Sequence, residues 1–190
     1  MTRTQYLFAF FAIIAGQARC EPVSFSIDPA HSMPRFSYNH FGFSNQLARF
    51  DKMSGKIQLD FDKHEGSMDI SVDASSIDTG NTLLNSHLKA GDFFDVGSYP
   101  VATFKSTNIA FEGDRPSAIA GNLTIHGVTQ PVTLNVNSFK HGPHGNLQNR
   151  EAVGGTASAS ISRTAFGLGR YAPNVGDDVI LTISLEAIRD

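Results

Sequence analysis

Apolar and polar residues alternate with a period of two along most of the chain from Val23 to the C-terminus. Successive side chains of a strand point to opposite faces, so this alternation predicts strands with one buried face. It indicates strands at residues 23–27, 36–38, 57–61, 68–74, 101–111, 118–125, 132–136, 153–161 and 179–188. We therefore predict eight or nine strands, most of them joined by short turns.

A single segment, residues 81–90, has a helical pattern instead. Leu83, Leu84, His87 and Leu88 fall on one face, and Gly91 is placed to end the helix. One short helix cannot cover a whole amphipathic sheet, so the sheet must close on itself or pack against a second sheet. The pattern predicts an all-β barrel or sandwich with one helical insertion, and antiparallel barrels of about eight strands can enclose a small ligand.

The predicted strand over residues 153–161 carries small residues on its apolar face, among them Gly155, Ala157 and Ala159. Such a face either accepts bulky side chains from across a packed core or borders a cavity. The pattern leaves both alternatives open. If residues 50–59 formed one regular strand, Phe50 would point to the opposite face from Met53, Ile57 and Leu59. We therefore predict a bulge between Phe50 and Met53.

The first twenty residues have the pattern of a secretory signal peptide. Arg3 precedes an uncharged apolar run over residues 6–15, which is shorter than the ~20 residues of a membrane-spanning helix. Small residues follow, so we expect cleavage after Ala18 or, preferably, after Cys20. The domain would then comprise residues 21–190, would lack cysteine and thiol chemistry, and would be periplasmic.

Composition narrows the function further. Hydrophobic residues make up 41% and charged residues 17% of the 190-residue chain, as expected for one globular domain. The net charge of −3 becomes more negative without the two arginines of the leader, which argues against nucleic acid as a partner. We expect no integral membrane span, and the sequence leaves a homodimer open.

Several segments, in this order, resemble the YceI family of bacterial exported proteins. They are Asp28-Pro29-Ala30-His31-Ser32, residues 36–44, Phe50, Gly55, residues 75–79, residues 87–89, residues 92–95, Tyr99-Pro100, residues 103–107, residues 121–125, residues 127–132, Arg163 and Phe166-Gly167. Two positions depart from the family pattern: Leu84-Asn85 replaces an Arg-Asp pair, and Ala165 replaces an acid. The charges that could orient a head group in the family are therefore missing at these positions.

The resemblance implies an eight-stranded, extended lipocalin-like antiparallel barrel whose apolar channel binds a polyisoprenoid, such as a prenyl pyrophosphate or a ubiquinone-like tail. It implies a carrier or reservoir, with no catalysis and no covalent cofactor. As residues that border the channel or contact a head group, we expect Phe36, Tyr38, His40, Phe50, His87, Leu88, Phe93, Phe94, Phe104, Ala157, Arg163 and Phe166. For Arg163, the alternative is that it only ties loops together.

Two other functions compete with this one. The first is a non-catalytic envelope stress or scaffold protein whose apolar interior is merely core. The second is a hydrolase that uses His31 or His40, which we expect to hydrogen-bond loops at the barrel mouth. His141 and His144 have a His-x-x-His spacing, but their Gly- and Pro-rich surroundings favour a solvated loop over a metal site.

Overall fold

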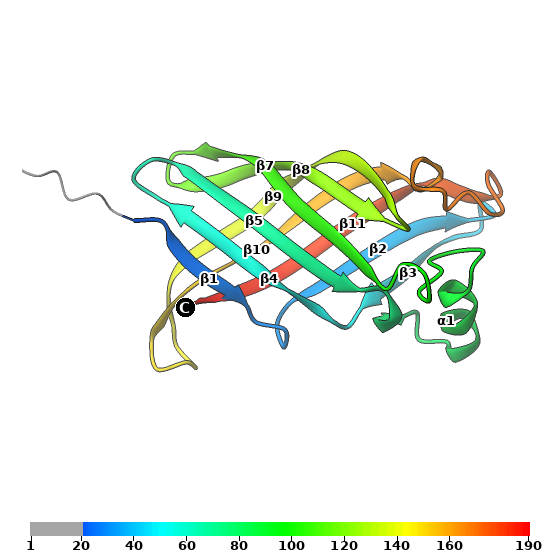
Figure 1. Ribbon diagram of the computed structural model, residues 1–190, viewed down its shortest axis with the longest axis horizontal. Coiled ribbons are helices and arrows are strands. Elements are labelled where there is room, and N and C mark those ends of the chain that lie inside the picture. Colours follow the sequence, from blue (N-terminus) through cyan, green and yellow to red (C-terminus); the bar gives the residue numbers. More distant parts are fainter. Residues whose placement is uncertain (1–20) are drawn as a thin grey trace, which may run out of the picture.

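A single antiparallel sheet forms nearly the whole molecule in the computed structural model, which describes residues 21–190 (Figure 1). Its strands are β1 (Val23–Ile27), β2 (Met33–His40), β3 (Ser44–Phe50), β4 (Met53–Asp60), β5 (Glu65–Asp73), β6 (Ile77–Asp78), β7 (Val101–Glu112), β8 (Arg115–Ile125), β9 (Val128–His144), β10 (Arg150–Ser162) and β11 (Val175–Arg189). The helix α1 covers Thr82–Lys89, and two 3-10 turns cover Ala74–Ser76 and Thr164–Phe166.

Eight of these strands close into a barrel. The order of pairing is β1-β4-β5-β7-β8-β9-β10-β11, and β1 also pairs with β11, which completes the ring. Closure removes the unpaired edges of an open sheet and lets every apolar face point inward. The predicted antiparallel eight-stranded barrel with one short helix is therefore confirmed.

Three long wall strands of the barrel are each divided in two. β1 pairs with the end of β11, and β2 pairs with the earlier part of β11. β1 and β2 are therefore consecutive halves of one long strand, which is interrupted at residues 28–32. β3 and β4 form a second such pair, interrupted at residues 51–52, because β3 pairs with β2 and β4 with β1. β5 and β6 are separated in the same way by residues 74–76.

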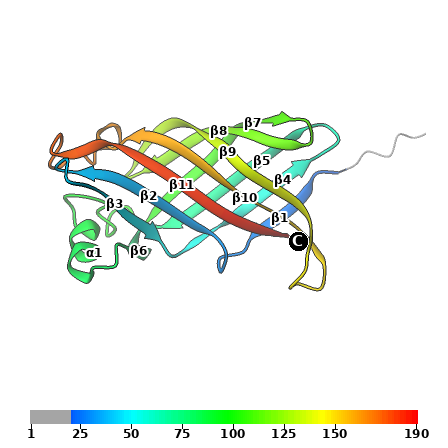
Figure 2. The same ribbon diagram turned by 180° about the vertical axis from the view of Figure 1, so that it is seen from behind.

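The ring of hydrogen bonds is complete only in one half of the barrel. In the other half, β6 pairs with β3 alone among the strands of residues 21–190, so the sheet is open between β6 and β7. The helix α1 lies at this end (Figures 1 and 2). Its first turn is capped by Asn81, whose side-chain oxygen accepts hydrogen bonds from the amides of Leu83 and Leu84.

Two clusters of apolar side chains line the interior. The larger lies in the closed half and includes Phe25, Leu59 and Phe104. The smaller joins Phe50 and Ile77 to Leu88 of α1. A close approach holds the Phe104 ring in place, because a Cβ atom on Gly121 of the neighbouring strand would lie 2.5 Å from its Cζ atom.

The structure corrects three expectations. β3 was not predicted, since most of its side chains are exposed and its sequence lacks a clear alternation. The expected bulge after Phe50 is a full strand break, which lets both Phe50 and Met53 face the interior. The predicted strand 132–136 extends to His144, and Pro143 is tolerated there because β9 beyond Asn135 pairs only with β10.

None of the helices within residues 21–190 is long and apolar enough to cross a membrane. The predicted signal peptide lies outside the described residues and stays a prediction.

Candidate functional site

The barrel encloses two connected cavities. One, here called the inner cavity, occupies the closed half and measures about 160 Å³. The other, the mouth cavity, lies at the α1 end and measures about 240 Å³. They share the lining residues Phe36, Phe50, Ala102, Ile125 and Leu181. The two spaces therefore adjoin one another and are together called the channel here. Each is far larger than the ~15 Å³ that a single buried water needs.

Apolar side chains from seven of the eight ring strands, all except β1, line the inner cavity. They include Met53, Ile57, Leu59, Met68, Ile70, Val72, Phe104, Ile109, Ile119, Leu123, Leu134, Val136, Phe139, Val153, Ala157, Ile183 and Leu185. The small residues Gly155 and Ala157 face this space, so the strand over residues 153–161 does border a cavity. An apolar cavity of this kind offers water no hydrogen-bond partners and accepts apolar guests instead.

Aromatic rings narrow the channel where the two cavities meet. The ring centroids of Phe36 and Phe50 are 5.8 Å apart, and Phe94 contacts Phe50 edge to face at 5.5 Å. Phe94 follows α1, so the helical insertion supplies one side of this constriction. Each such ring pair stabilises the fold by about 0.5–1.5 kcal/mol in addition to the contribution of its buried area. These contacts hold the rings in place and so fix the shape of this part of the channel.

The mouth cavity adds a few polar groups to an apolar wall. Tyr38 and His40 of β2 and His87 of α1 line it. Burial raises the pKa of the Tyr38 hydroxyl, which therefore stays protonated and able to donate a hydrogen bond at neutral pH. The His87 ring packs edge to face on Phe93, with 4.9 Å between ring centroids.

Arg163 is buried at the mouth, and its guanidinium is largely committed to the main chain. It donates to the carbonyl oxygens of Gly176 at 2.8 Å, Val175 at 2.6 Å, Arg170 at 2.9 Å and Leu168. Burial lowers its pKa, which the nearby Asp177 carboxylate opposes. Of the five N–H donors of an arginine, at least four are thus occupied, which supports the alternative that Arg163 ties loops together.

All of the residues expected to border the channel line one or both cavities. In the mouth cavity these are Phe36, Tyr38, His40, Phe50, His87, Leu88, Phe93, Phe94, Arg163 and Phe166. Phe104 and Ala157 line the inner cavity. The structure thus brings the expected residues to one channel, while their contact with a ligand stays a prediction.

The histidines outside the channel are placed differently from expectation. His31 lies at the break before β2 and hydrogen-bonds Asp28, whereas His40 lies at the far end of β2, roughly 23 Å of strand away. The expectation of His31 at the barrel mouth is therefore wrong. His141 and His144 lie in a strand rather than a solvated loop, and they have different partners, Glu151 and Glu186.

Sequence reasoning passed over two groups of lining residues. The aliphatic residues of the inner cavity, such as Ile109, Ile119 and Leu134, follow the same period-two alternation as the predicted strands and could have been found from it. Leu168 and Tyr171 belong to an irregular loop, where no periodic signal exists.

Comparison with known proteins agrees with this architecture. A UPF0312 protein of Pseudomonas paraeruginosa is 33% identical over 180 residues, which cover 92% of this chain and 91% of that protein. The crystal structure of Burkholderia cenocepacia BcnA aligns with a TM-score of 0.66 and 27% identity, and covers 84% of this chain and 98% of that one.

A third similarity extends to a more distant protein. A structure described as a polyisoprenoid binding domain from Saccharophagus degradans shares the fold, with a TM-score of 0.63 and 18% identity, over 88% of this chain and 99% of that one. The sequence profile of the YceI-like domain matches residues 25–187, which is nearly all of the barrel. The chain therefore belongs to the YceI family.

Proposed function

We propose that this protein binds a polyisoprenoid lipid, either a prenyl pyrophosphate or a ubiquinone-like tail, in the channel and carries it or holds it in reserve in the periplasm. The observation that carries the proposal is the apolar interior of the barrel, where two adjoining cavities share lining residues and have an almost entirely apolar wall. The polyisoprenoid-binding description of the Saccharophagus degradans domain, which shares the fold, is consistent with it.

The physical basis is the removal of a water-insoluble chain from water. Each buried methylene contributes about 0.8 kcal/mol, so a long tail gains a large gross affinity without polar recognition. Ordering the tail and losing its translational freedom offset much of that gain. The narrow part of the channel between Phe36, Phe50 and Phe94 would then select an extended, thin chain over a bulky one.

A catalytic role has little support in the channel. The polar residues that line the mouth cavity are Tyr38, His40, His87 and Arg163. Neither cavity has a carboxylate among its lining residues that could orient a histidine base. The binding role therefore fits the chemistry of the wall better than hydrolysis does.

The test is extraction of the protein from a bacterial host with organic solvent, followed by mass spectrometry of the co-purified lipids. We expect a polyisoprenoid in stoichiometric amount. A protein that is purified without lipid, and that fails to take up a fluorescent prenyl analogue, would favour the scaffold alternative. N-terminal sequencing of periplasmic protein should give a start near Glu21, and an intact Met1 in the cytoplasm would contradict the location.

A further inference from the structure

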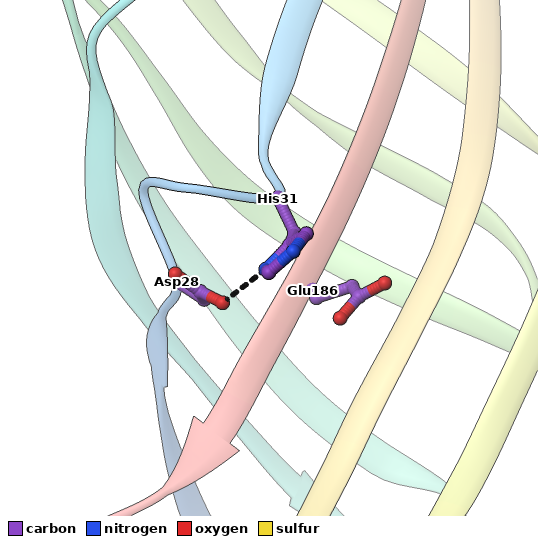
Figure 3. A group of neighbouring side chains, drawn as sticks. All are labelled: Asp28, His31 and Glu186. Carbon is purple, nitrogen blue, oxygen red and sulfur yellow. Dashed lines mark hydrogen bonds and ion pairs between the residues drawn. The ribbon is translucent and has the colours of Figure 1, made fainter. Parts of the chain in front are cut away.

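A cluster of metal-ligating side chains lies on the outer wall of the barrel, away from the channel. Asp28 and His31 belong to the connection that interrupts β1 and β2, and Glu186 projects from β11 beside it (Figure 3). Each offers one ligand atom, and these three atoms lie within 4.8 Å of one another.

The main chain holds this cluster in a fixed frame. The amide of Asp28 donates to the carbonyl oxygen of Glu186 at 2.9 Å. The hydroxyl of Ser32, which is buried, donates to the same carbonyl at 3.1 Å and accepts from the amide of Glu186 at 3.1 Å. Hydrogen bonds at both the amide and the carbonyl of Glu186 thus hold the connection against β11. The backbone positions from which the side chains of Asp28, His31 and Glu186 extend are therefore fixed.

A second imidazole approaches from β9. This is the ring of His144, whose Nε2 atom lies 3.1 Å from Oε2 of Glu186. The Nδ1 atom of the same ring is buried and has no hydrogen-bond partner within residues 21–190. Nδ1 of His31 lies 2.7 Å from Oδ2 of Asp28. A tetrahedral cation with bonds of about 2.0–2.1 Å keeps its ligand atoms roughly 3.3 Å apart. The two nitrogen–oxygen distances, 2.7 and 3.1 Å, are shorter than this spacing, so the side chains must move apart by up to about 0.6 Å to hold an ion.

Space for an ion is present next to these groups. A hollow of about 480 Å³ on the outer surface is lined by His31, His144 and Glu186, together with Gly142 and Gly154. His31 is 61% exposed and Glu186 40% exposed, so an ion can reach the cluster without unfolding of the barrel.

We propose that Asp28, His31 and Glu186, with His144 as fourth ligand, form a binding site for a divalent transition metal of the zinc class. Two imidazole nitrogens with two carboxylate oxygens suit zinc, whereas calcium and magnesium take oxygen ligands. The bound ion connects three separate pieces of the wall: the β1–β2 connection, β11 and the far end of β9.

Calorimetry on the untagged protein, stripped of metal by EDTA, tests the site. We expect one zinc ion bound per chain and no calcium binding. His31→Gln and His144→Gln should each weaken zinc binding at least tenfold, since even supporting groups of metal sites contribute 10–100-fold. His141→Gln is the matched control, because that imidazole pairs with Glu151 and stacks on Phe61 outside the cluster. Its zinc affinity should stay within twofold of wild type.

A second measurement on the wild-type protein does not depend on the folding of any variant. In NMR spectra, zinc should shift the ring signals of His31 and His144 together at one equivalent and leave those of His141 unchanged. Zinc should also raise the melting temperature. Absence of zinc binding, equal affinity in the variants, or ring shifts at His141 instead would overturn the proposal.

Discussion

The guanidinium of Arg163 donates a hydrogen bond of 2.6 Å to the carbonyl oxygen of Val175, the first residue of β11. Together with its bonds to Leu168, Arg170 and Gly176, this contact organises the loop between β10 and β11 around one buried side chain. Arginine suits this position because its planar fork reaches several acceptors at once and remains charged when buried.

Loss of this side chain should therefore affect stability more than ligand selectivity. Arg163→Ala leaves buried carbonyl oxygens without hydrogen-bond donors, which costs about 1–3 kcal/mol for each such group. We therefore expect the free energy of unfolding, measured in urea, to fall by at least about 2 kcal/mol. Binding of a neutral prenyl alcohol and of a prenyl pyrophosphate should weaken equally. A selective loss of the pyrophosphate of tenfold or more would assign Arg163 to the head group instead.

Filling the inner cavity should block lipid uptake. Ala157→Phe adds a ring to the cavity wall, where it occupies the space of the guest instead of displacing packed neighbours. We expect loss of co-purified lipid with a change in unfolding free energy below the ~1–3 kcal/mol of an overpacked core. Ala110→Phe, on the exposed face of β7, adds the same bulk outside the barrel and should bind lipid normally. Unfolding of Ala157→Phe with wild-type lipid content would indicate packed core.

The close approach of β8 to Phe104 should make Gly121 intolerant of any side chain. A Cβ atom there would lie 2.5 Å from the Phe104 ring and 2.5 Å from the carbonyl oxygen of Lys105, so Gly121→Ala must displace backbone as well as a ring. We expect about 1–3 kcal/mol of destabilisation by chemical denaturation. Gly91→Ala, whose Cβ would meet nothing within 4 Å, is the control and should change stability little. Equal effects of the two changes would contradict this geometry.

The Asp28–His31 pair should make stability depend on pH in the metal-free protein. Its hydrogen bond raises the pKa of His31 above 6.5 and lowers that of Asp28 below 3.8. The His31 contribution is fully present below pH 6.5 and is lost as pH rises through its raised pKa. The Asp28 contribution is present above pH 3.8 and is lost as pH falls through its lowered pKa.

NMR titration in EDTA measures this coupling directly. Asp28→Asn should return the pKa of His31 toward 6.5, because the neutral amide no longer stabilises the imidazolium. A pKa of His31 that is the same in both proteins would show that the pair does not form in solution.

The sequence was sufficient for the barrel because strand periodicity is a local signal. The alternation around Phe25 and Ile27, and around Phe104, already places those side chains inside. β3 was missed because its outer face and half of its inner face are exposed, so no clear alternation marks it. The lining aromatic residues were found through the family resemblance, since a pattern alone cannot separate a cavity wall from packed core.

The remaining features depend on contacts between distant parts of the chain. His31 and Glu186 meet only because β11 spans the break between β1 and β2, which no local pattern reveals. The commitment of Arg163 to four carbonyl groups likewise follows from the path of an irregular loop. The sequence analysis placed Arg163 at the mouth, where the structure also has it, but could not reveal its hydrogen bonds to four main-chain carbonyl groups.

The division of the barrel into a closed and an open half has a thermodynamic consequence. Displacing α1 and β6 breaks the short pairing of β6 with β3, the Arg49–Asp78 ion pair and the packing of Leu88 and Phe94 on Phe50, but it leaves the eight-stranded ring intact. We therefore expect the mouth to open as a unit of its own, at a lower free-energy cost than the global unfolding of the domain. Under the proposed function, a long guest would enter and leave through such local openings, while the ring around its far end stayed folded.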